Sequence, residues 1–153
     1  MTDQSVAPPA LHADRFLPIT PVRLVISHKL EDVTAAFVGT EWEQKLQKGL
    51  PYKLIENADI ARRTIPAMFG KASKLVDAKG AILREAALKK MRLLLGGEVE
   101  RLQTLARVND HVRPEEIRLA QAELEELGRV LGQAQLRLDS LRLIWKGPPE
   151  ALR

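Results

Sequence analysis

Residues 114–141 read PEEIRLAQAELEELGRVLGQAQLRLDSL, and this stretch decides the predicted fold. Its apolar residues recur at steps of three and four, which is the spacing of one face of an α-helix and of a coiled-coil seam. The seam consists of Ile117, Ala120, Leu124, Leu127, Leu131, Ala134, Leu138 and Leu141. Pro114 suits the first helical position, and Glu115 and Glu116 complement the helix dipole in the first turn. We therefore predict a long helix over about residues 114–139, with an apolar face that needs a partner.

The predicted partner is a second long helix over about residues 66–107. This range has no proline after Pro66, and its apolar residues recur with a helical period. Residues 108–113, VNDHVR, hold turn formers, so we expect an antiparallel hairpin with the seam as its core. The alternative is that the seam is a dimerising surface. Gly96 and Gly97 weaken the first helix, which favours a kink there.

Two short strands are predicted to form a small base for the hairpin. Pro18 and Pro21 enforce an extended backbone, and the alternation that follows is typical of an edge strand over residues 21–27. Residues 141–146 also alternate between apolar and other side chains. We expect them to form a terminal strand that pairs with the first one.

The predicted fold class is mainly α, of the α+β type, with a long antiparallel helical hairpin on this small base. Residues 41–48 are expected to add a short amphipathic helix that ends at Gly49 and Pro51. Residues 1–14 are polar and contain prolines, so we expect them to be poorly ordered. Residues 15–153 are expected to form a single domain, because about 100 to 200 residues is an ordinary domain size.

Composition excludes several classes of site. The 153-residue chain has a formal net charge of +4 and no cysteine, which excludes disulfides, thiolate zinc sites, iron–sulfur clusters and a cysteine nucleophile. His12, His28 and His111 lie far apart and lack the spacing of metal ligands. No apolar run approaches the roughly 20 residues of a membrane helix, and no signal-peptide pattern opens the chain. We expect a cytoplasmic protein with no membrane partner.

Motifs for catalysis and nucleotide binding are missing from the sequence. It contains no GxxxxGK[ST] loop, GxGxxG turn, GxSxG elbow or HExxH pair. Its many acidic residues fall on helices with a heptad pattern, where they are usually solvated. We therefore expect no catalytic residue, no metal site and no cofactor in this chain.

Positive charge is concentrated in residues 57–93, where nine basic residues oppose three acidic ones, a net charge of +6. Residues 98–126 have a net charge of −4. The nine basic residues are Arg62, Arg63, Lys71, Lys74, Lys79, Arg84, Lys89, Lys90 and Arg92. Clustered Lys and Arg bind phosphates with release of counterions, so these residues are candidates for contact with a DNA or RNA backbone or an acidic protein. The alternative is an ordinary solvated helix face.

Three stretches carry a resemblance to a known family. They are residues 15–23 (RFLPITPVR), 102–109 (LQTLARVN) and 137–144 (RLDSLRLI). In this order they resemble the C-terminal domain of the RapA family, bacterial RNA polymerase-associated ATPases of the SWI/SNF type that recycle RNA polymerase. The chain departs from the family pattern at Ile19, where a second proline is common, and at Asp110-His111, which replaces a proline-containing turn.

The resemblance implies a terminal part of a much larger, cytoplasmic bacterial motor. Its implied partners are the RNA polymerase core and the parent protein's own ATPase domains. ATP is implied as a cofactor of the parent alone, because the family's ATPase motifs match nothing here. We predict a non-catalytic module that serves interdomain packing or RNA polymerase contact. The alternative is a free-standing helical-hairpin adaptor that binds nucleic acid through a basic stripe, formed by Lys71, Lys74, Lys89 and Arg92 on one face of the first long helix.

Overall fold

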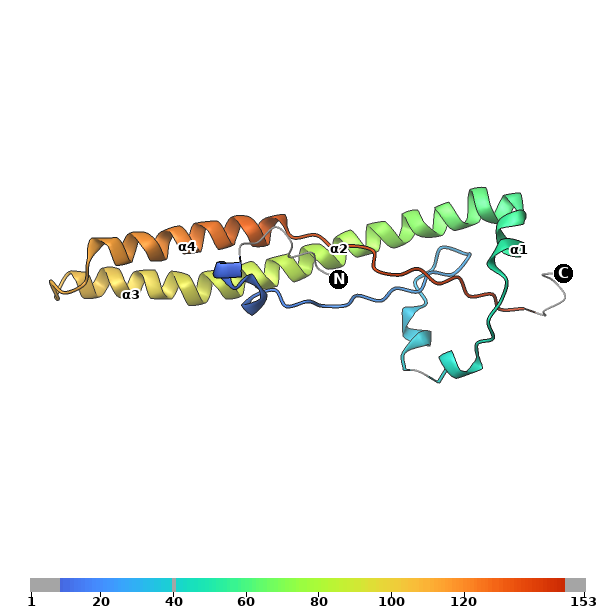
Figure 1. Ribbon diagram of the computed structural model, residues 1–153, viewed down its shortest axis with the longest axis horizontal. Helices are drawn as coiled ribbons and strands as arrows, with labels where there is room; N and C mark the ends of the chain where they lie inside the picture. The colour runs from blue at the N-terminus through green and yellow to red at the C-terminus, as the bar shows by residue number, and fades with distance from the viewer. Residues whose placement is uncertain (1–8, 40, 148–153) are drawn as a thin grey trace. The chain divides into compact units, whose positions relative to one another are not determined.

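The computed structural model describes residues 9–39 and 41–147, and these residues are mainly helical (Figure 1). The α-helices are α1 (Pro51–Glu56), α2 (Ile65–Met91), α3 (Gly97–Ala106) and α4 (Pro114–Gln133). Short 3₁₀ helices lie at Pro9–Leu11, Ala13–Arg15, Thr34–Phe37 and Glu43–Lys45. The predicted mainly helical fold with a long hairpin is confirmed.

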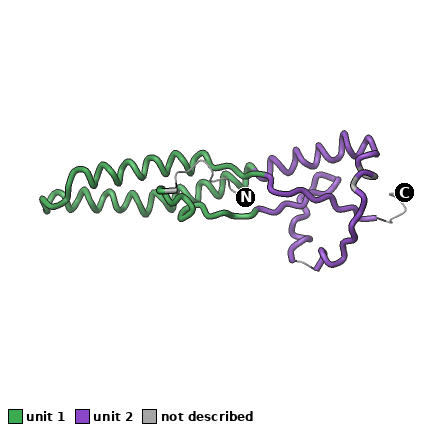
Figure 2. Tube along the Cα trace, viewed as in Figure 1, with its two compact units in different colours: residues 1–21, 77–137 green, residues 22–76, 138–153 purple. Residues whose placement is uncertain are grey.

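The chain divides into two compact units (Figure 2). Unit 1 comprises residues 1–21 and 77–137, and unit 2 comprises residues 22–76 and 138–153. The residues of α2 are therefore shared between the units. The predicted division into an N-terminal segment and one domain stays a prediction, and residues 1–8 of that segment lie outside the described residues.

Helices α3 and α4 form the hairpin in unit 1, joined by the turn that follows Ala106 (Figure 1). Pro114 occupies the first turn of α4, where its missing N–H costs no intrahelical hydrogen bond. From the predicted seam, Leu127 and Leu131 are 0% and 1% exposed. These two side chains therefore form the centre of the hairpin's core.

Helix α4 ends at Gln133, earlier than the predicted end near residue 139. Ala134 has extended backbone angles, and the Arg84 guanidinium donates a hydrogen bond to its carbonyl oxygen over 3.0 Å. Leu136 then lies against Gly80, with its Cδ1 3.4 Å from where a Cβ on that glycine would be. These contacts hold the chain in an extended conformation. The last three seam positions, Ala134, Leu138 and Leu141, therefore lie beyond the helix, and Leu138 and Leu141 are exposed.

One π-helical turn precedes α2 at Ile60–Thr64, and a second one interrupts the first arm between α2 and α3 at Arg92–Gly96. The second one ends at the Gly96-Gly97 pair, where the sequence predicts a weak point. Glycine lowers the cost of departing from regular α geometry, and π turns are a known cause of helix kinks. Helical structure thus continues through the glycine pair into α3.

The N-terminal segment supplies part of the core of unit 1. Ala13, Phe16 and Leu17 are at most 6% exposed. They join a buried cluster with Ala87, Met91, Leu127 and Leu131. Lys90 also donates a hydrogen bond to the Arg15 carbonyl over 3.1 Å. The segment around Phe16 is therefore a strap that packs on the hairpin, which the sequence did not predict.

The predicted strands are wrong, because the described residues contain no strand, only isolated bridge positions such as the antiparallel bridge between Ile26 and Asp32. The backbone groups of residues 25–27 bond to the turn that directly follows them. Val33 N–H donates to the Val25 carbonyl, and Ser27 N–H donates to the Glu31 carbonyl, both over 2.9 Å. Local pairing therefore occupies residues that were expected to pair with 141–146.

The predicted helix over residues 41–48 is also wrong. Only a 3₁₀ turn, Glu43–Lys45, forms there, and Pro51 begins helix α1 instead of ending an earlier one. An isolated helix of two turns is marginal in water, whereas proline is favourable at a first helical position. Further along, the Asn57 side chain accepts hydrogen bonds from Asp59 and Ile60 N–H and caps the helical run that leads into α2.

Candidate functional site

Three of the nine predicted contact residues have partners within the chain. Arg63 forms an ion pair with Asp59 over 3.0 Å. Arg84 and Lys90 each donate to a backbone carbonyl, as described above, and thereby hold the segments that flank the hairpin. These two residues of α2 therefore have a structural role in unit 1.

The other six basic residues have no ion pair or hydrogen bond from their side chains within the described residues. They are Arg62, Lys71 and Lys74 in unit 2, and Lys79, Lys89 and Arg92 in unit 1. In unit 1, Lys89 and Arg92 line an open hollow of about 420 Å³ together with Ala81, Arg84, Glu85 and Leu88. Glu85 is the one acidic side chain in this lining, so the hollow carries net positive charge.

The acidic part of the hairpin is different, because arginines along the same helices neutralise several of its carboxylates. Ion pairs at i,i+3 spacing join Glu98 to Arg101, Glu115 to Arg118 and Glu126 to Arg129. The hydrogen bonds from Arg101 and Arg129 lower the pKa of Glu98 and the pKa of Glu126. On α2 and the turn after it, by contrast, Lys79, Lys89 and Arg92 have no acidic partner within the described residues of unit 1.

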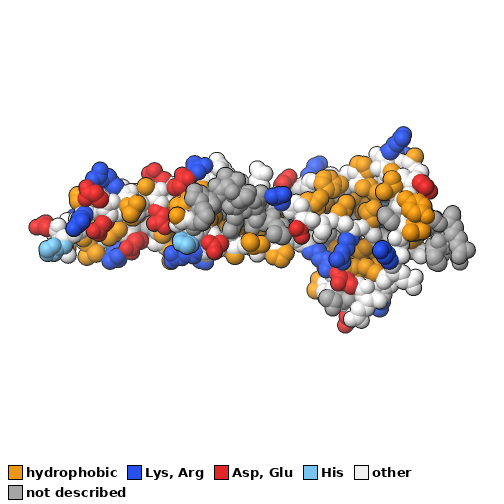
Figure 3. Space-filling view, viewed as in Figure 1, with side chains coloured by type: hydrophobic (Ala, Val, Ile, Leu, Met, Phe, Trp, Pro, Cys, Tyr) orange, Lys and Arg blue, Asp and Glu red, His pale blue; other side chains and the backbone are white. Residues whose placement is uncertain are grey.

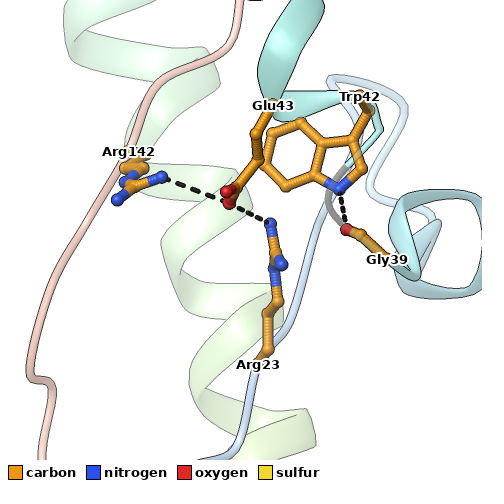
Figure 4. Close-up of polar contacts among 5 residues, drawn as sticks. All are labelled: Arg23, Gly39, Trp42, Glu43 and Arg142. Carbon is orange, nitrogen blue, oxygen red and sulfur yellow. Dashed lines mark hydrogen bonds and ion pairs between the residues drawn. The ribbon is translucent and has the colours of Figure 1, made fainter.

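A cluster in unit 2 joins segments that are far apart in the sequence (Figure 4). The Glu43 carboxylate accepts ion pairs from Arg23 over 3.5 Å and from Arg142 over 3.4 Å. Arg23 also stacks on Trp42, with its guanidinium carbon 4.4 Å from the ring centroid. The indole N–H of Trp42 donates to the Gly39 carbonyl over 2.8 Å. This Arg23–Glu43 cluster was missed, because its members share no sequence spacing that signals contact.

Unit 2 has no buried apolar core among its described residues. All described hydrophobic residues that are buried belong to unit 1. The large exposed ones of unit 2 are Leu30, Val38, Leu46, Leu50, Tyr52, Ile55, Phe69, Leu138, Leu141, Leu143, Ile144 and Trp145. Figure 3 shows apolar side chains gathered on the visible face of this unit. Such exposure on one small unit is typical of a surface that binds a partner.

Neither a metal site nor a membrane-spanning helix is present in the described part of the chain. No group of three or more His, Cys, Asp or Glu side chains is placed to hold a metal ion among residues 9–39 and 41–147. In the same residues, no helix is both long and apolar enough to cross a membrane.

Comparison with known proteins identifies the family. The model of the RNA polymerase recycling family C-terminal domain matches residues 2–146. The chain belongs to this family. It is 33% identical over 145 residues to the RNA polymerase-associated protein RapA of Vibrio atlanticus, and 34% identical over 141 residues to that of Vibrio parahaemolyticus. The RapA protein of Photobacterium profundum is 32% identical over 141 residues.

Each of these alignments covers 90% of the chain but 14% of the relative. The recycling-family domain is thus a small part of the longer proteins. Two of the stretches that carry the family resemblance meet in its structure, since Arg23 belongs to residues 15–23 and Arg142 to residues 137–144, and both contact Glu43. The same first stretch contributes Phe16 and Leu17 to the core of unit 1.

The Arg23–Glu43 cluster predicts a measurable coupling in unit 2. Glu43→Gln and Arg142→Ala, combined in a double-mutant cycle, should give a coupling of about 0.2–1 kcal/mol, as is typical of exposed ion pairs. Arg23→Ala should cost about 0.5–1 kcal/mol more than Arg142→Ala, because it also removes the stacking on Trp42.

Urea unfolding followed by tryptophan fluorescence suits this test, because Trp42 and Trp145 both lie in unit 2. Lys45→Ala is the matched control, since Lys45 lies in the same 3₁₀ turn without an ion pair in the described residues. If Arg23→Ala were no more destabilising than Lys45→Ala, the cluster would have no structural role.

Proposed function

We propose that this chain is a non-catalytic module of an RNA polymerase recycling factor. It packs against the factor's other domains or contacts the RNA polymerase core. Membership in the recycling family supports this, as do the names of the relatives, which are RNA polymerase-associated proteins. We assign ATP binding and hydrolysis to other parts of such a factor, because the sequence here has no phosphate-binding loop. The module acts in the bacterial cytoplasm, where RNA polymerase works.

The exposed apolar residues of unit 2 carry the proposal. A free-standing helical domain of this size normally buries large apolar side chains in each compact part. Unit 1 does so, whereas unit 2 exposes aromatic and aliphatic side chains such as Tyr52, Phe69 and Trp145. Aromatic residues are enriched at the centres of protein interfaces. Unit 2 is therefore the part of the module that we assign to partner contact.

The proposal predicts how a chimera behaves. Vibrio atlanticus RapA in which this chain replaces the aligned region should co-elute with purified RNA polymerase core, and the variant with that region deleted should bind at least about 10-fold more weakly. The isolated chain should release no phosphate from ATP. Hydrolysis of ATP by the isolated chain would contradict the proposal. Equal polymerase affinity of the deletion variant and the chimera would contradict the polymerase contact and leave interdomain packing as the proposed role.

A second candidate function is nucleic-acid binding through the basic stripe of a free-standing adaptor. The six basic side chains without a partner in the described residues favour it, because unpaired cations are available to phosphates. The described residues place no aromatic ring among Lys71, Lys74, Lys89 and Arg92 for base stacking, apart from Phe69 near the start of α2. Any such contact would therefore be to the phosphate backbone.

This alternative predicts a change in salt dependence. Replacing Lys71, Lys74, Lys89 and Arg92 together by Ala should reduce the slope of log affinity against log salt by about 0.9 for each phosphate of duplex DNA that the variant no longer neutralises. The matched control replaces Arg101, Arg107, Arg113 and Arg118 by Ala, which removes the same charge from the acidic part of the hairpin. Equal slopes for the two quadruple variants, or no binding by the unmodified chain, would reject the alternative.

A further inference from the structure

The segment after α4 is extended and its backbone is unpaired. Residues 138–147 have no helix, strand or turn, and within the described residues their N–H and carbonyl groups form no backbone hydrogen bond. The polar contact of this segment is the Arg142 side chain on Glu43. An extended chain with free backbone donors and acceptors is a template for pairing with a β-strand.

The side chains of this segment have the pattern of an amphipathic strand. Leu141, Leu143 and Trp145 alternate along the chain, so in an extended conformation they share one face. They are 62%, 40% and 43% exposed. Arg142, Ile144 and Lys146 fall on the opposite face, which is therefore the more polar of the two. A strand of this kind buries its apolar face against a layer of other side chains when it joins a sheet.

The segment that was expected to pair with residues 141–146 forms no backbone hydrogen bond with them. The backbone of residues 25–27, the expected partner, is bonded to residues 31–34. Arg142 is meanwhile fixed by Glu43, which anchors the middle of the segment to unit 2. The segment is therefore held at one point while its hydrogen-bonding edge and its apolar face stay open.

We infer that residues 141–146 add as an edge strand to a β-sheet in the remaining polypeptide of the longer proteins of this family. The inference rests on the proposed function, because it specifies the contact between the module and its parent. This chain spans 14% of its RapA relatives, which leaves most of their length to supply the sheet. A sheet offers both the backbone partner and the apolar layer that covers Leu141, Leu143 and Trp145.

A second copy of the chain is a less favourable pairing partner for residues 141–146. Two such segments pair as a two-stranded ribbon, which is marginally stable in water. The ribbon also leaves its apolar face uncovered, because it has no second layer of side chains to pack against Leu141, Leu143 and Trp145. An existing sheet with its own packed layer satisfies both requirements.

Amide hydrogen exchange by mass spectrometry tests the inference. It compares the isolated 153-residue chain with the Vibrio atlanticus RapA chimera that carries it. Amides of residues 141–146 should exchange near the intrinsic rate in the isolated chain and at least about 100-fold more slowly in the chimera. Amides of α4 report in the same spectra whether the hairpin is folded. If the chimera does not fold, native Vibrio atlanticus RapA is measured at the segment aligned with residues 141–146, with the same expected protection.

Proline variants locate the pairing edge. Leu143→Pro and Ile144→Pro each remove one N–H from opposite edges of the strand, so one of them should abolish the protection in the chimera. Neither should alter urea unfolding of the isolated chain. Ser140→Pro, which precedes the alternating residues in the same exposed segment, is the control and should leave the protection intact.

Fast exchange of residues 141–146 in a folded chimera, or in native RapA, overturns the inference. Protection in the isolated chain that rises with protein concentration also overturns it, because the occupant is then a second copy. The two proposals fail separately. A chimera that binds polymerase with fast exchange at residues 141–146 contradicts the strand inference alone. A protected strand in the chimera together with ATP hydrolysis by the isolated chain contradicts the proposed function alone.

Discussion

The burial of Phe16 and Leu17 against α2 and α4 is the contact on which unit 1 depends. Two helices packed side by side bury one stripe each, and a third element is needed to enclose that stripe. Phe16 and Leu17 provide it, and Met91, Leu127 and Leu131 are at most 1% exposed as a result. A buried side chain of this size contributes about 1.5–3 kcal/mol relative to an exposed one. The strap therefore supplies a large part of the stability of the hairpin.

The basic residues of α2 serve two purposes, and the structure separates them. Lys90 and Arg84 bind the carbonyls of Arg15 and Ala134, so they fix the strap and the segment that leaves α4. Lys89 and Arg92 stay unpaired within the described residues and line a positively charged hollow. Unit 2 differs from unit 1 in what stabilises it. Its described residues form ion pairs and a cation–π contact, but none of their apolar side chains is fully buried. A buried core in one unit and exposed apolar side chains in the other support the proposal that the chain is a module of a larger protein.

The sequence predicted the helices well because their apolar period is set by local geometry, and Leu127 and Leu131 are indeed central. Other features depend on contacts that no local pattern records. The strap was expected to be poorly ordered up to residue 14 and extended after it, because the proline pattern around Phe16 carries no information about packing on a distant helix. Arg142 meets Glu43 across most of the chain. The sequence identified the nine basic residues as a concentration of positive charge. It did not show which of their side chains bind backbone carbonyls, as Arg84 does.

The stability of Phe16→Ala tests most directly whether unit 1 depends on the strap, measured by urea unfolding of the chain with helical circular dichroism. We expect a loss of about 3–5 kcal/mol, the cost of truncating a buried phenylalanine. Ile19→Ala, three residues further along and 61% exposed, is the matched control and should change the free energy of unfolding by less than about 0.5 kcal/mol. If Phe16→Ala were as stable as Ile19→Ala, the strap would not hold the hairpin together, and the central role given to Phe16 would be wrong.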